Sequence, residues 1–548
     1  MPSPAPVSAV SAPVRSTRRP SPFVLLIVAT LLIRGAVLFP ALRSFDGDPD
    51  DYRRLAENWA VYNVFGTETT PTAFRPPLYP WTLKTFVFPL IRADERSAAP
   101  TAASPNPPVS PNLTQPSDET ALSLPPETPN SPNSPQPTAE RSVFDRYFAL
   151  SRNAAFALFH WLLGVATVAV VYRFARRLDF GPKSAAAVGF LVAVDPILLQ
   201  QSRLVMTETL AALFAALLLD ATAAVAARRS PQTALATKPP VSAPAAFVAF
   251  AALGVLFGVS TLCRPAFFAF AGLVFLLVAA QGFVVAVKTR KLDRLFAAAL
   301  FLLGIGAAVA PWTLRNLRAF DRPILTTTHG GYTRYLAHNP EIYRHFELSP
   351  PWSLWNPEPF HRRRAVEYAA ALADAGLEPG STEAELFQNR WTSERADETI
   401  RSAPRTFFYS IGLRVGELWR VLPNAVDAEG RPLASPDLEP PRRRAARFAV
   451  AVFYSFELTA ALLGAAFLAV RAFRRRRETP VVDAVLFSPW TLGALLVASV
   501  QIPHLIYWTN MRMRAPLEIF VPALAIFAVV ALLRRRETPP SLNDNSAD

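Results

Sequence analysis

Blocks of about 20 apolar residues recur along the chain with few charges inside them, and a helix of that length crosses the hydrocarbon core of a bilayer. The pattern therefore predicts an all-α integral membrane protein. About ten transmembrane helices are expected on this criterion. They lie at about residues 23–42, 153–174, 184–200, 207–227, 244–262, 265–287, 294–311, 446–471, 484–507 and 516–533.

The segment 78–91 is moderately apolar but is not counted among the spans. It is short, contains Lys84 and begins among prolines, so a helix lying at the membrane surface explains it better. If it crossed the membrane, the basic clusters that follow it would change sides. The loop after the first span is therefore expected to carry interfacial helices.

Charge gives the orientation of these spans. Lys and Arg number 56 against 42 Asp and Glu, a net charge of +14, but the basic residues cluster at the ends of apolar blocks. Such clusters mark the cytoplasmic side, so no nucleic-acid partner is expected. With the predicted spans, both termini and every cluster share one side, at residues 173–177, 228–229, 288–291, 474–477 and 534–536. We expect a multi-pass protein of the cell inner (plasma) membrane with both termini cytoplasmic.

Composition divides the rest of the chain. Residues 93–145 are rich in Pro, Ser, Thr and Asn with almost no aromatic residues, which predicts a disordered outer linker. The segment 312–445 spaces Trp, Tyr and Pro among charges, which predicts a small outer cap. The expected parts are a cytoplasmic tail (1–20), the first helix and outer loop (21–92), the linker (93–145), a transmembrane core (146–311), the cap (312–445), C-terminal transmembrane helices (446–534) and a second tail (535–548).

Four carboxylates follow the first span directly, at Asp46, Asp48, Asp50 and Asp51. Acids beside a lipid-embedded helix are tolerated if they are solvated or if they handle a cation, a proton or a substrate. Glu208, at the start of a later helix, is predicted to face the same compartment. It could serve only the helix dipole, or it could join the loop acids as a second group that orients a substrate or holds a metal ion.

Several arginines are predicted on the outer side, against the general bias. Arg264, Arg315, Arg512 and Arg514 stand near the outer ends of spans. Each alone could be a snorkelling side chain, but together with nearby acids they indicate an anionic ligand, since guanidinium binds phosphate oxygens bidentately.

The chain has no Gly-rich loop leading into a Lys-Ser/Thr pair, so a substrate that arrives from the membrane is favoured over a nucleotide. The single cysteine, Cys263, excludes a disulfide framework.

These motifs occur in an order that resembles a known family. The motifs are Asp48-x-x-x-Tyr52, Arg75-Pro-Pro-Leu-Tyr-Pro80, Thr207-Glu208, Arg264-Pro265, Pro311-Trp-x-x-Arg-Asn316, Gly330-Gly331-Tyr332 with Asn339-Pro340, and Arg512-x-Arg514-x-Pro516. Together they resemble the polytopic GT-C glycosyltransferases. The nearest branch is the glycosyltransferase 39 group, similar to dolichyl-phosphate-mannose protein mannosyltransferases and to aminoarabinose transferases.

The resemblance implies a GT-C fold and transfer of a sugar, with inversion, from a polyprenyl-phosphate donor to an acceptor on the outer or periplasmic face. The catalytic base maps best to Asp48 by its spacing to Tyr52, with Asp51 as competitor, and Glu208 matches the second acid. No cofactor is required; a divalent cation, if bound, would be held by Asp48 and Glu208. The acceptor, whether protein, lipid or glycan, is not specified. Residues expected to bind the substrate and its lipid phosphate are Arg75, Tyr79, Arg264, Arg315, Asn316, His504, Arg512 and Arg514.

Two other classes of function fit parts of the pattern. A transporter or flippase for a lipid-linked sugar or polymer would use the same arginines to hold a headgroup, but it needs polar or broken helices near the bilayer midplane. Here the polar groups gather at the outer rim. A membrane scaffold whose cap binds a partner leaves the acids and arginines unexplained. Glycosyl transfer is therefore the favoured function.

Overall fold

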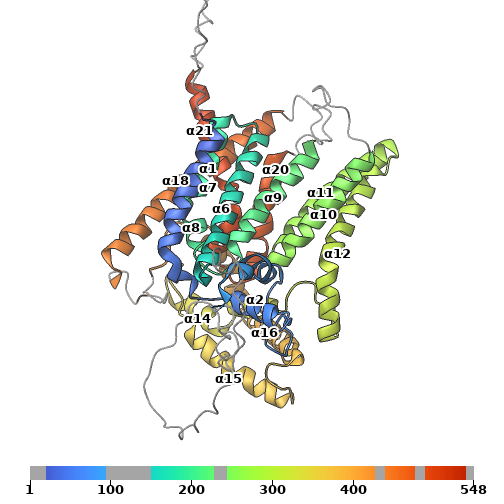
Figure 1. Ribbon diagram of the computed structural model, residues 1–548, viewed down its shortest axis with the longest axis vertical. Helices are drawn as coiled ribbons and strands as arrows, with labels where there is room; N and C mark the ends of the chain where they lie inside the picture. The colour runs from blue at the N-terminus through green and yellow to red at the C-terminus, as the bar shows by residue number, and fades with distance from the viewer. Residues whose placement is uncertain are drawn as a thin grey trace, which may run out of the picture.

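The computed structural model describes residues 20–93, 95, 150–227, 243–425, 433, 438–475 and 488–537. In these residues the fold is helical, and the only β-type pairing is two isolated bridges (Figure 1). The predicted linker lies almost wholly outside the described residues. The helices are α1 (Pro22–Leu38), η1 (Phe39–Phe45), α2 (Tyr52–Val61), α3 (Leu78–Thr82), η2 (Leu83–Val87), η3 (Phe88–Leu90), α6 (Arg152–Arg177), α7 (Pro182–Val194), α8 (Pro196–Gln201), α9 (Glu208–Ala227), α10 (Ala243–Cys263), α11 (Phe267–Thr289), α12 (Asp293–Phe320), α13 (Gly330–Ala337), α14 (Pro340–Leu348), α15 (Glu358–Asp374), α16 (Thr382–Ser402), α17 (Pro404–Leu418), α18 (Pro441–Arg475), α20 (Pro489–Gln501), η6 (Pro503–Leu505), η7 (Met511–Leu517) and α21 (Val521–Glu537).

Long apolar helices form a bundle, which confirms the prediction of an all-α multi-pass membrane protein for the described residues. Seven of them are long and apolar enough to cross a membrane, at Pro22–Phe45, Arg152–Arg177, Glu208–Ala227, Pro244–Cys263, Phe267–Thr289, Asp293–Phe320 and Pro441–Arg474. An eighth span is a pair, Met511–Leu517 and Val521–Arg534, bent by 65°.

The predicted number of ten spans is not reached by these criteria, because two apolar helices are short. α7 and α20 have 13 residues each. Pro196 lacks an amide hydrogen, and the carboxylate of Asp195 accepts a hydrogen bond from the amide of Leu198 at 2.7 Å. The chain therefore ends α7 and starts the short helix α8 at this point. The count of ten stays a prediction.

The two ends of the bundle differ in what they carry. The start of α1 and the end of α21 lie at one end, and α2, α15 and α16 lie at the other (Figure 1). We call residues 321–425 the cap segment; its helices build a separate apolar cluster around Tyr335, Phe360 and Trp391. α12 continues past Pro311 to Phe320, so the transmembrane helix extends beyond the boundary expected at residue 312.

Two glycines allow α10 and α12 to approach closely. A Cβ atom on Gly254 would lie 2.1 Å from the carbonyl oxygen of Phe301, and one on Gly304 would lie 2.3 Å from that of Ala251. No side chain fits at such distances. Small residues at a helix contact increase van der Waals packing where lipid supplies no hydrophobic driving force.

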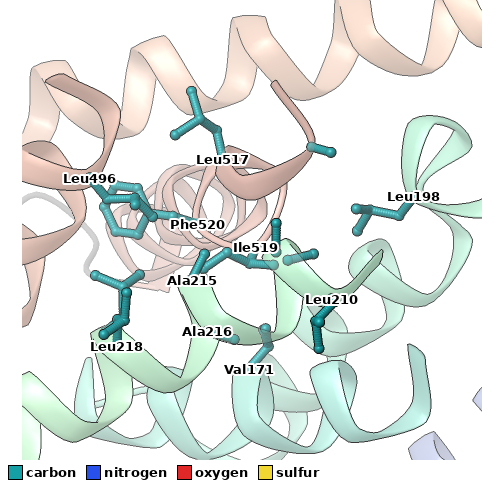
Figure 2. Packing of buried hydrophobic residues seen from close by; sticks show 14 of the residues in the cluster. Val171, Leu198, Leu210, Ala215, Ala216, Leu218, Leu496, Leu517, Ile519 and Phe520 are labelled. Carbon is teal, nitrogen blue, oxygen red and sulfur yellow. The ribbon is translucent and has the colours of Figure 1, made fainter. Parts of the chain in front are cut away.

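The centre of the bundle is an apolar core that joins helices far apart in sequence. α6 packs against α9, and η7 packs against α9 and α20. Figure 2 shows buried side chains of this core from these elements, from α8 and from the residues that follow η7: Val171, Leu198, Leu210, Ala215, Ala216, Leu218, Leu496, Leu517, Ile519 and Phe520. The core therefore fixes the loop that carries Arg512 against the start of α9, which carries Glu208.

Candidate active site

The acidic loop places Asp48 at the amino end of α2. The backbone amide of Arg53 donates to Oδ1 of Asp48 at 3.1 Å, and that of Arg54 donates to Oδ2 at 2.9 Å. These bonds satisfy amide groups that the first turn of a helix leaves unpaired, and they orient the carboxylate. Each carboxylate oxygen keeps a second lone pair, so Asp48 can still accept a proton.

Burial makes Asp48 more basic than an ordinary aspartate. It raises the pKa of Asp48 to about 6, even though the amides of Arg54 and Arg53 act in the opposite direction. A group with this pKa is ionised at neutral pH and still binds a proton readily, as a general base requires.

Asp51, the competing acid, has a different environment. Its backbone is left-handed, with φ of 59°, and its carboxylate forms an ion pair with Arg54 at 3.1 Å. Both side chains are about one third exposed, at 32% and 33%. The ion pair ties Asp51 to the surface of α2, and the choice of Asp48 as the base stays a prediction.

Asp50 turns inward and binds Arg75. The Nη2 of Arg75 donates to Oδ1 of Asp50 at 2.9 Å, and its Nη1 lies 3.3 Å from Nε2 of His329. The guanidinium also lies over the ring of Tyr52, 5.7 Å from its centre. Burial and the positive charge of Arg75 lower the pKa of His329 below its ordinary value, so this imidazole is neutral. Three segments distant in sequence thus meet at Arg75.

Two further arginines flank Glu208. Arg264 Nη1 and Arg512 Nε lie 3.7 and 3.8 Å from Oε1 of Glu208, and Arg512 Nη2 lies 4.0 Å from Oδ2 of Asp50. These distances are too long for hydrogen bonds. The hydrogen bonds described for the two guanidinium groups go to sulfur atoms, of Met513 at 3.0 Å and Met206 at 3.2 Å.

This arginine pair has unused hydrogen-bonding capacity inside the protein. Among the described residues, Arg264 Nη1, Arg512 Nε and Glu208 Oε2 are buried and have no hydrogen-bond partner. Buried donors without partners are costly, and for charged groups the cost is larger. Because both guanidinium groups lie within 4 Å of Glu208, one anion could accept hydrogen bonds from both.

Two predicted ligands, Tyr79 and His504, interact electrostatically with Glu208 and Arg264 respectively, but their polar atoms contact other residues. Tyr79 is fully buried; its hydroxyl lies 2.7 Å from Nε2 of His160, and its ring packs edge-on against Tyr52. His504 is buried with its Nδ1 3.1 Å from the hydroxyl of Thr509. Both contacts position neighbouring side chains, and substrate contact by either residue stays a prediction.

Three other predicted phosphate ligands hold the fold in the described structure. Arg315 donates to the carbonyls of Thr72 at 2.8 Å and Phe65 at 2.9 Å, and Asn316 donates to that of Ile324. Arg514 is fully buried and pairs with Glu518. None of the three has a described contact with Asp50 or Glu208. Position in a motif could not reveal this, because it does not give the direction of the side chain.

Glu385, on α16 of the cap segment, was not identified from the sequence and connects two site segments. Its Oε1 accepts from the amide of Ala73 at 2.9 Å and from the hydroxyl of Thr328 at 2.6 Å, while Oε2 accepts from the hydroxyl of Thr72 at 2.6 Å. Arg75 and His329 follow within a few residues. Glu385 is therefore a positioning residue for them, and the only sequence signal was an acid in a predicted helix.

Replacing Glu385 with alanine is expected to destabilise the protein by about 3 kcal/mol, because three part-buried hydrogen bonds lose their carboxyl acceptor. Thermal unfolding of the purified protein measures this. Glu398→Ala is the matched control: Glu398 is exposed on the same helix and pairs with Arg395 at 3.2 Å, so its loss should change stability by less than about 0.5 kcal/mol. Equal effects of the two substitutions on stability would contradict the role of Glu385 as a positioning residue.

Comparison with solved structures gave distant similarities. The apo oligosaccharyltransferase of Archaeoglobus fulgidus is 14% identical with a TM-score of 0.44, over 96% of this chain and 53% of that one. The same organism's AglB, with an inhibitory peptide and a dolichol-phosphate, is 12% identical with a TM-score of 0.41, over 96% and 52%. ArnT from Cupriavidus metallidurans bound to undecaprenyl phosphate is 14% identical with a TM-score of 0.35, over 94% and 81%.

The chain thus spans about half the length of the archaeal oligosaccharyltransferases. A search of curated proteins found no match. A family comparison did find one, and it includes Glu208 and Arg264 but neither Asp48 nor Arg512. The family resemblance inferred from the motifs is confirmed by this match: residues 131–315 fit the sequence model of the dolichyl-phosphate-mannose-protein mannosyltransferase family.

Proposed function

We propose that this chain is a membrane glycosyltransferase that transfers a sugar, with inversion, from a polyprenyl-phosphate carrier to an acceptor. One observation carries the proposal: Arg264 and Arg512 lie beside the same acid, and each has a buried donor nitrogen without a hydrogen-bond partner. A lipid phosphate supplies the missing acceptor oxygens. The family matched by residues 131–315 is named for a sugar donor of this class, which supports the choice of ligand.

The proposed reaction forms one bond at the anomeric carbon and breaks another. Asp48 takes the proton of an acceptor hydroxyl while that oxygen attacks the carbon from the face opposite the phosphate. The bond between sugar and phosphate breaks, and the phosphate gains a second negative charge. Arg264 and Arg512 stabilise this charge as it develops. Attack from the opposite face inverts the anomeric centre.

Glu208 is proposed to hold the two arginines in place. A phosphate leaving group is already acidic, so no second carboxylic acid is needed to protonate it, unlike in glycoside hydrolysis. The optional divalent cation does not fit at this pair, since Glu208 faces two guanidinium groups and Asp48 binds two backbone amides. No step is derived through a metal ion at this pair.

The experiment that tests the function follows a labelled sugar. Purified protein is placed in vesicles that contain a panel of polyprenyl-phosphate sugars and a membrane extract as the source of acceptor. The proposal predicts release of polyprenyl phosphate together with transfer of the label, and loss of both in Asp48→Asn. Movement of the intact lipid-linked sugar between leaflets, with the glycosidic bond unbroken, would establish a flippase instead.

The site is proposed to face the outer compartment of the plasma membrane. The basic ends of α6 and α21 lie at the opposite end of the bundle from α16 (Figure 1), as the positive-inside rule requires for an outer site. A cysteine placed at Glu398, with Cys263 replaced by alanine, should react with an impermeant thiol reagent added outside the cell. Labelling only after the membrane is opened would reverse the orientation.

A further inference from the structure

Three carboxylates from distant parts of the chain converge inside the helix bundle, away from the site described above. Asp195 lies between α7 and α8, Glu457 lies on α18, and Glu518 follows η7. One ligand oxygen from each lies within 4.8 Å of the others. The side chains are 0%, 6% and 0% exposed, and the neighbours of Glu518 in sequence, Leu517 and Ile519, belong to the apolar core (Figure 2).

Each oxygen of the first carboxylate, that of Asp195, accepts one hydrogen bond. Oδ1 of Asp195 accepts from the amide of Leu198 at 2.7 Å, and Oδ2 accepts from the hydroxyl of Tyr454 at 3.0 Å. The amide of Ile197 donates in turn to the Tyr454 hydroxyl at 2.9 Å. These bonds keep the Asp195 carboxylate in one orientation, so this member of the three acids is held rigidly.

The other two carboxylates have oxygens without partners. Oε1 of Glu518 accepts from Nε of Arg514. Among the described residues, Oε2 of Glu518 and both oxygens of Glu457 are buried and accept no hydrogen bond. An ionised carboxylate in apolar surroundings costs several kcal/mol unless a charge or donor compensates it. An ionised Glu457 in particular requires a positive partner.

The nearby arginines do not supply that partner. Arg514 acts electrostatically on all three carboxylates, but it pairs with Glu518, and its Nη1 donates to the carbonyls of Leu418 and Arg420. When ionised, as metal ligands are, the three acids carry three negative charges against the positive charges of Arg514 and Arg34. Arg34, the next buried cation, acts electrostatically on Asp195, but it donates to the carbonyl of Val192 at 3.1 Å and does not act on Glu457.

We propose that Asp195, Glu457 and Glu518 bind one divalent cation of the kind that prefers oxygen ligands, Ca²⁺ or Mg²⁺. No two of the three ligand oxygens are more than 4.8 Å apart, so small movements of the glutamate side chains bring all three within a Ca–O distance of about 2.4 Å from one ion. Its positive charge supplies the partner that an ionised Glu457 lacks.

The ion would join α8, α18 and the segment between η7 and α21. η7, which directly precedes this segment, carries Arg512. The cation is therefore a structural ligand that holds the last loop of the candidate site, and it takes no part in the chemistry. The inference does not depend on the proposed function.

The test measures metal content and thermal unfolding of the full chain in detergent. After the protein is passed through metal-free buffer, elemental mass spectrometry should detect about one Ca²⁺ or Mg²⁺ bound per chain. A chelator should lower Tm by about 5 °C or more, and adding back CaCl₂ or MgCl₂ should restore it. Glu457→Gln keeps the shape of the side chain and should abolish both the bound metal and the shift.

Glu208→Gln is the matched control, since it removes a buried acid from the other site; metal content and the Tm shift should be retained. A wild-type chain with no bound metal and no Tm shift in either salt would overturn the proposal. So would a Tm that rises as the pH is lowered and does not respond to added metal. Metal retained in Glu457→Gln but lost in Glu208→Gln would place the ion at the candidate active site instead.

Discussion

Asp48→Asn is expected to lower the turnover of sugar transfer by about a thousandfold, with little change in thermal stability. Removing a general base typically costs a factor of about 10² to 10⁴. Asparagine can still accept the amide hydrogen bond of Arg53 or Arg54 through its oxygen, so α2 should keep its start. Single-turnover kinetics with a labelled polyprenyl-phosphate sugar measures the chemical step directly.

The acidity of Asp48 adds a pH dependence to this prediction. Its pKa is raised to about 6, so the base is ionised above that pH and protonated below it. In the wild type, kcat should be level above pH about 6 and fall about tenfold for each unit below it. The residual activity of Asp48→Asn should lack this fall.

Asp51→Asn is the matched control, because Asp51 lies in the same loop and pairs with Arg54 at the surface. It should keep activity within a few-fold of the wild type. Near-normal turnover in Asp48→Asn, together with loss of turnover in Asp51→Asn, would assign the base to Asp51.

Replacing Arg264 or Arg512 with alanine is expected to lower kcat/KM by a factor of about 10² to 10³, equivalent to about 3–4 kcal/mol of transition-state stabilisation. Each variant removes donors that the leaving phosphate is proposed to use and leaves Glu208 short of a positive neighbour. Lysine at either position should recover part of the loss, since it keeps the charge but not the bidentate geometry.

The control for this experiment is Arg322→Ala, which removes an exposed arginine from the cap segment. It should leave kcat/KM unchanged. Retention of polyprenyl phosphate by the purified variants, measured by native mass spectrometry, separates donor binding from chemistry. Arg264→Ala and Arg512→Ala that fold normally, retain the lipid phosphate and turn over at the wild-type rate would refute the proposed phosphate site.

Much of this arrangement follows from the sequence alone. The apolar blocks predict a helical membrane protein, and the surplus of basic residues at block ends predicts that both termini share one side. Glu208, Arg264 and Arg512 were selected because the positive-inside rule disfavours arginines at the outer ends of spans, and an acid beside lipid needs solvent or a charged partner. The structure brings these three together with Asp50 and supports that reasoning.

Other parts required the folded chain. Four acids in six residues look alike in the sequence, yet Asp50 points to Arg75, Asp51 pairs on the surface and Asp48 binds the start of α2. The difference arises from the turn of the loop, including a left-handed residue at Asp51. Such a turn depends on tertiary packing, and for aspartate it is not specified by residue type.

Composition and periodicity determined the class of fold, the membrane environment and the types of group available for chemistry, because burial in lipid constrains every residue of a span. Only the tertiary structure decided which of those groups meet. Glu385 reaches the site from a helix more than 300 residues after Thr72, and Arg315 and Arg514 turn away to hold carbonyl groups and Glu518. Side-chain direction and long-range packing depend on contacts between segments that no local pattern encodes.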